Sequence, residues 1–137
     1  MSISLLAQAT SQPGLTGRVY NLKVDDDIRF PDNRITQQTS PTTTVSCNDK
    51  FAGVITTEPL TTAVGGTTTF TVTAVGGVGD GSFIGCHITD YQGAGIPILR
   101  VTRNAPANSF NVSITNIDGA AALNQALEMC YLVTEEI

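Results

Sequence analysis

A period-two alternation of apolar and polar residues constrains the fold of this chain more than any other feature of its sequence. In residues 67–74, Phe70, Val72 and Ala74 alternate with threonines. Residues 110–115 alternate in the same way. Because successive side chains of a strand point to opposite faces of a sheet, both segments predict strands with one buried face.

Further strands are predicted at residues 82–89, 96–103 and 127–134, separated by turns rich in glycine, asparagine and proline. Residues 120–125 favour a helix but are too short for more than a turn or two, so we expect a connector there. Short strands at such regular intervals predict an all-β fold, an antiparallel β-sandwich or jelly-roll-like domain. The core-facing side chains expected in the first and last of these strands are Ile84, Cys86, Ile88, Met129, Tyr131 and Val133.

Residues 1–50 differ in texture and predict an extended N-terminal arm ahead of a sandwich domain at 51–137. Residues 36–46 consist almost entirely of Gln, Thr, Ser and Pro, which bury too little apolar area to offset the entropy of ordering. Apolar side chains earlier in the arm must be buried against the sandwich or, as we favour, against a partner. These candidate partner-binding residues are Val19, Tyr20, Leu22, Val24, Ile28 and Phe30.

Composition supports a sheet protein and excludes several functional classes. Charged residues make up 14% of the chain, against roughly 25% in typical soluble domains. The net charge is −5 and only seven basic residues are spread along the chain, which argues against nucleic-acid binding. No apolar run reaches the roughly 18–20 residues of a membrane span. The N-terminus lacks the basic region of an export signal, so we expect synthesis and folding in a cytoplasm.

The sequence offers few groups that could carry chemistry. The cysteines, Cys47, Cys86 and Cys130, are odd in number and lack CxxC spacing, so we expect buried free thiols; pairing of two of them in an oxidising medium stays open. The single histidine, His87, follows Cys86 on a predicted strand. The two side chains therefore point to opposite faces and cannot form a catalytic dyad.

Two further segments could suggest a ligand, but neither carries a complete motif. Residues 25–27 are three aspartates without the spaced ligands, glycine and terminal glutamate of an EF-hand loop. Residues 76–81 are glycine-rich but precede no helix and contain no GK[ST] element, so we expect a plain hairpin loop. We predict no catalytic residue, no metal ligand and no cofactor, and hence a non-enzymatic protein.

Three segments near the C-terminus follow one another in a recognisable order. Residues 108–116 read Asn-Ser-Phe-Asn-Val-Ser-Ile-Thr-Asn, residues 120–124 read Ala-Ala-Ala-Leu-Asn, and residues 130–133 read Cys-Tyr-Leu-Val. With these segments, residues 60–137 resemble small virion proteins of tailed bacteriophages. The resemblance implies a capsid-associated β-sandwich, either a decoration (cement) protein or the head of a fibre, and it brings no active-site residues.

The residues and the resemblance together predict a capsid decoration protein at the virion surface. We expect it to bind between subunits of the major capsid protein and to copies of itself, with no nucleic-acid or membrane partner. The alternative is a fibre head or receptor-binding (carbohydrate-binding) module that uses residues 76–81 and 93–95 at one end of the sandwich. A tail or neck subunit also fits the sequence.

Overall fold

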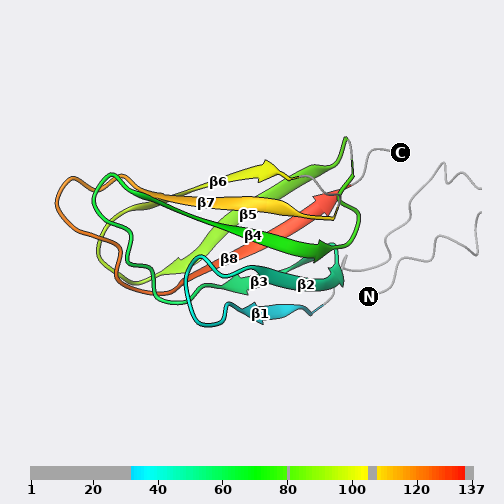
Figure 1. The fold of residues 1–137 in the computed structure, drawn as a ribbon, viewed down its shortest axis with the longest axis horizontal. Helices are drawn as coiled ribbons and strands as arrows, with labels where there is room; N and C mark the ends of the chain where they lie inside the picture. The colour runs from blue at the N-terminus through cyan, green and yellow to red at the C-terminus, as the bar shows by residue number, and fades with distance from the viewer. Residues whose placement is uncertain (1–31, 80, 105–107, 135–137) are drawn as a thin grey trace, which may run out of the picture. The chain divides into compact units, whose positions relative to one another are not determined.

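The computed structural model describes residues 32–79, 81–104 and 108–134, and these residues form eight β-strands and no helix. The strands build two four-stranded sheets that face each other (Figure 1). Sheet A has the order β1 (Arg34–Thr36), β3 (Ala52–Thr56), β8 (Leu127–Thr134), β5 (Phe83–Tyr91). Sheet B has the order β2 (Val45–Lys50), β4 (Thr67–Val75), β7 (Phe110–Asn116), β6 (Pro97–Arg103). The predicted all-β sandwich is confirmed.

Both sheets are mixed, because two strand pairs are parallel. Strand β1 runs parallel to β3, and β2 runs parallel to β4, whereas every other pairing is antiparallel. The antiparallel prediction therefore holds for four pairings: β3 with β8, β5 with β8, β4 with β7, and β6 with β7. A jelly roll needs two antiparallel Greek keys, and the parallel pairings of β1 and β2 depart from that arrangement.

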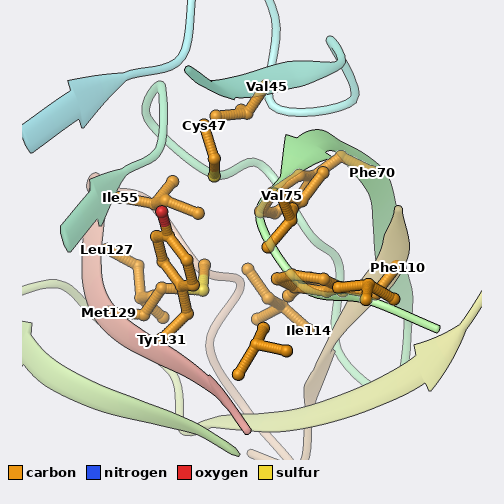
Figure 2. Close-up of a cluster of buried hydrophobic side chains, with 14 of the residues drawn as sticks. Val45, Cys47, Ile55, Phe70, Val75, Phe110, Ile114, Leu127, Met129 and Tyr131 are labelled. Carbon is orange, nitrogen blue, oxygen red and sulfur yellow. The ribbon is translucent and has the colours of Figure 1, made fainter. Parts of the chain in front are cut away.

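The apolar faces of the two sheets meet in one core (Figure 2). Phe110 of β7 and Tyr131 of β8 pack across the layers, with ring centroids 6.2 Å apart. Burying each large side chain stabilises the fold by roughly 1.5–3 kcal/mol. The predicted inward register of β8 is confirmed, since its alternate residues are buried, and Ile84, Cys86 and Ile88 of β5 pack against the core while partly buried.

One predicted core position in β4 is wrong. Ala74 has a positive φ of 50°, so the alternation slips and Val75 is the buried residue instead. The neighbouring strand is irregular at the same level: its register against β4 shifts between Ser46 and Lys50. A bulge of this kind places an extra residue in the strand without interrupting the core face.

The predicted boundary at residue 50 also needs correction. Strands β1 and β2 lie inside the segment assigned to the arm, and Val45 and Cys47 are buried in the core. The polar segment between β1 and β2 is held by the buried side chain of Gln37, whose Nε2 donates to the carbonyl of Pro41 at 3.0 Å. A buried amide thus orders a segment that apolar burial alone would leave without structure.

Two predicted connections differ from the structure as well. Residues 120–125 form neither helix nor strand, and Leu123 is buried with its N–H bonded to the carbonyl of Thr62 at 2.9 Å. The predicted connector is confirmed, but it contains no helical turn. The glycine-rich connection at 76–81 is no hairpin, because it joins β4 of sheet B to β5 of sheet A.

Candidate partner-binding surface

The predicted partner-binding residues of the arm cannot be placed on the fold. Val19, Tyr20, Leu22, Val24, Ile28 and Phe30 all lie outside the described residues, as do the aspartates 25–27. Their predicted role stays a prediction. The candidate surface below is built from the described residues.

His87 and Cys86 point to opposite faces of β5, as predicted. Cys86 is partly buried against the core, and His87 is exposed on the outer face of sheet A. On that outer face His87 stands directly opposite Cys130 of β8. Sequence reasoning missed this pair, because only strand pairing brings the two positions together. Among the described residues, no group of three or more His, Cys, Asp and Glu side chains could hold a metal ion.

A buried network links the start of β1 to the core, and we call it the Asn33 network (Asn33, Cys47, Lys50, Gly53 and Tyr131). The Asn33 Nδ2 donates to the carbonyl of Cys47 at 3.1 Å and to the Tyr131 hydroxyl at 2.8 Å. The same hydroxyl donates to the carbonyl of Lys50 at 3.1 Å. Gly53 makes room for the main chain of Asn33, since a Cβ at residue 53 would lie 2.5 Å from the Asn33 carbonyl oxygen.

Burial holds two thiols and the phenol of this region in their neutral forms. Burial raises the pKa of the Cys47 thiol to about 11, and its hydrogen bond with Tyr131 opposes the shift. Burial, and then the neighbouring thiols Cys130 and Cys47, raises the pKa of Cys86 to about 12. Burial and Cys47 also raise the pKa of Tyr131 above its usual value. All three thiols are free, and none of these shifts activates a thiolate.

The outer face of sheet B carries a ladder of hydroxyl groups across β4 and β7. Thr67 pairs with Thr115 at 2.8 Å, and Thr69 pairs with Ser113 at 2.9 Å. The next step is a hydrogen bond from Thr71 to Asn111. Cross-strand pairs of this kind stabilise a sheet by roughly 0.2–1 kcal/mol each. They also satisfy the hydroxyls locally, which explains the many threonines of β4.

At one end of the outer face of sheet B, apolar side chains lie beyond the hydroxyl ladder. Val64, Ile96, Ile98 and Ile117 are 46%, 51%, 48% and 56% exposed. Strand pairing and loop contacts bring them together: the N–H of Ile117 donates to the carbonyl of Ile96 at 2.9 Å, and Gly65, which follows Val64, donates to the carbonyl of Asn116. We call this cluster the apolar corner.

The apolar corner is held in place by a second buried amide, that of Asn116. Its Nδ2 donates to the carbonyl of Ala121 at 2.8 Å and lies 3.3 Å from that of Ala63. Its Oδ1 accepts from the N–H of Ile96 at 3.2 Å and from that of Asp118 at 3.1 Å. The side chain therefore ties three loops together, and we call these contacts the Asn116 network.

A shallow apolar hollow of about 350 Å³ lies at another position, lined by Phe51, Gly76, Gly77 and Val133. These four described residues offer no side-chain hydrogen-bonding group that would orient a sugar. The two loops assigned to the carbohydrate-binding alternative also lie apart. Strand β5 begins after the 76–82 connection and ends before the 92–96 connection, so the loops are at opposite ends of the sandwich (Figure 1).

Comparison with known proteins identifies no relative: no family model, no curated protein and no solved structure matches the chain. Within the described residues, no helix is long and apolar enough to cross a membrane.

Proposed function

We propose that this protein is a non-enzymatic virion structural protein of the capsid decoration (cement) type. It is made in the host cytoplasm, sits on the capsid surface, binds between subunits of the major capsid protein and associates with copies of itself. The resemblance of its C-terminal half to small phage virion proteins favours this class.

The apolar corner is the observation that carries the proposal. Large aliphatic side chains left half in water are a cost unless a partner covers them, and contiguous apolar patches on soluble proteins mark interaction sites. The Asn116 network fixes the corner on ordered loops, so that little entropy is lost when a partner docks. The Ile and Val side chains of the apolar corner can be buried by a partner without any catalytic chemistry.

The arm adds a second contact in this proposal. Its alternating apolar residues suit an extended segment that lies on a neighbouring protein, where main-chain hydrogen bonds and scattered apolar anchors both contribute. Many copies on one lattice would gain further from multivalency.

Binding to decoration-free capsids tests the function. The full chain and a chain of residues 32–137, which retains every described strand, are mixed with capsids stripped of the protein and sedimented. We expect the full chain to saturate the shells and the shortened chain, still cooperatively folded, to stay in the supernatant. Failure of the full chain to bind refutes the decoration role, and full occupancy by the shortened chain refutes the role of the arm. Specific binding of the full chain to a glycan array would instead favour the receptor-binding alternative.

A further inference from the structure

The two sheets formed by the described residues have four edge strands, and three of these strands are short or irregular. Strand β1 is three residues long. In β2, Asn48 and Asp49 have positive φ and the register shifts, and in β5 the register shifts between Ile88 and Asp90. Short or bulged edges resist the addition of another strand. Strand β6 is different, because it keeps one unbroken register against β7 over all seven residues.

No strand among the described residues pairs with the side of β6 that faces away from β7. Hydrogen bonds from Ile117 to Ile96 and from Asn104 to Ser109 mark the two ends of the β6–β7 pairing. Since bonded positions alternate along an antiparallel strand, Leu99 and Val101 direct their N–H and C=O groups away from β7. Pro97 lacks an N–H and offers only its carbonyl there. In Figure 1, β6 lies at the margin of the sandwich.

The side chains of β6 fit a second copy of the same strand. Ile96 and Ile98, both in the apolar corner, alternate with the half-buried Leu99 and Val101, and the charged residues of the strand, Arg100 and Arg103, are both basic. Parallel pairing of two β6 strands would set like charges side by side. Antiparallel pairing about a two-fold axis at Ile98 sets Ile98 against its counterpart and Arg100 beside Ile96 of the other copy. The two Arg100 side chains are then four positions apart, about 13 Å, which exceeds the Debye length of about 8 Å at physiological salt.

We propose that the β6 edge and the apolar corner form a self-association surface, through which two copies pair antiparallel and join their B sheets into one continuous sheet. The N–H of Leu99 donates to the carbonyl of Pro97 of the other copy, and two-fold symmetry repeats the bond. The two apolar corners then lie side by side on the same face of the joined sheet. This deepens the self-association named in the proposed function, and it needs no capsid.

A single engineered cysteine tests the register. In directly opposed, non-hydrogen-bonded positions the Cβ atoms lie about 4.5–5.5 Å apart, near the separation a disulfide spans. Under mild oxidation, Ile98→Cys should give a covalent dimer in high yield on a non-reducing gel. Thr102→Cys, on the same face of the same strand but far from its counterpart, should stay at the level of the wild-type protein. Equal cross-linking of both variants, or none at position 98, overturns the proposed pairing.

Sedimentation of the purified full chain tests the association itself. The wild-type protein should form a dimer in a concentration-dependent manner, and Ile98→Asp should weaken it at least tenfold, because two carboxylates then face each other. Thr102→Asp is the matched control and should dimerise like the wild type. A wild-type chain that stays monomeric, or a dimer indifferent to Ile98→Asp in a variant that still unfolds cooperatively, contradicts the proposal. No capsid is present, so these outcomes leave the decoration proposal to its own test.

Discussion

The Asn33 network and the Asn116 network solve the same problem with different chemistry. Each places a buried asparagine amide where several chain segments meet, and each satisfies main-chain groups that the sheets leave unpaired. Among the described residues, the hydrogen bonds of the Asn116 side chain all go to main-chain groups. The Asn33 network instead includes the Tyr131 phenol and lies beside the Cys47 thiol, both held neutral by burial.

The two networks serve different parts of the molecule. One supports the exposed apolar corner, and the other anchors the start of β1 to the core. The Asn116 network carries the apolar corner, and its own hydrogen bonds join one side-chain amide to main-chain groups, none of which titrates. The Asn33 network secures the start of β1 against the core and depends on protonated groups. Four predictions test this comparison, with the largest expected effect first and the smallest last.

Removing the Asn116 amide should have the largest effect. Asn116→Ala leaves buried carbonyl and N–H groups without partners, and each such group costs about 1–3 kcal/mol. We expect a loss of about 3–5 kcal/mol in the free energy of unfolding, measured by denaturant titration. Asn111→Ala, on the same strand but with one side-chain bond to Thr71, should cost about 1 kcal/mol. Equal losses in the two variants would show that the Asn116 amide contributes no more to stability than the Asn111 amide does.

Filling the space at Gly53 should disturb the other network less. In Gly53→Ala the new Cβ meets the Asn33 carbonyl oxygen at 2.5 Å and the Tyr131 ring at 2.9 Å. Overpacking of this kind costs about 1–3 kcal/mol. Gly119→Ala, where nothing lies within 4 Å, is the control and should leave the unfolding free energy within about 0.5 kcal/mol. An unfolding free energy that Gly53→Ala leaves unchanged would mean that Asn33 does not pack against residue 53.

Alkaline pH should weaken the molecule through Cys47. Its pKa rises from 9.0 to about 11 on folding, so the native state keeps the proton longer than the unfolded state. The contribution, roughly 2–3 kcal/mol, is complete below pH 9 and is lost as the pH rises from 9 past 11. Denaturant titrations across this range should show the loss, and Cys47→Ala should reduce its slope. A slope unchanged in Cys47→Ala would rule out this thiol as the source.

Substitutions at exposed contacts near either network should change the unfolding free energy least. The Arg34–Glu128 ion pair spans 3.6 Å, and the Arg34 side chain is 69% exposed. Arg34→Met and Thr115→Val should each change the unfolding free energy by less than about 1 kcal/mol. A larger change in either variant would mean that surface pairs, rather than the buried amides, hold the segments together.

The long strands of the fold could be predicted because their alternation is long. Residues 127–134 were predicted as a strand and form β8 with the same bounds. Strand β1 was missed because three residues are too few for a period to show, and β2 because its second half is polar and bulged. The slip at Ala74 depends on a single backbone conformation, which an apolar alternation does not reveal.

The candidate surface could be predicted only in part. The alternation of β6 separates Ile96 and Ile98 from Leu99 and Val101, but it does not say which pair is exposed; the structure shows that the two isoleucines face outward. Val64 and Ile117 were missed, because each lies in a loop where no period assigns a face. Their meeting depends on the Asn116 network, and neither that network nor the His87–Cys130 pairing has a local signal in the sequence.

Imaging of the phage particle that we propose carries this protein tests the central claim most directly. At a resolution that traces strands, we expect the sandwich on the outer surface of the capsid, at junctions between major capsid subunits and in a fixed ratio to them, with Val64, Ile96, Ile98 and Ile117 covered by protein. A particle whose shell lacks the sandwich, or a bound sandwich whose apolar corner faces open solvent, would contradict the account.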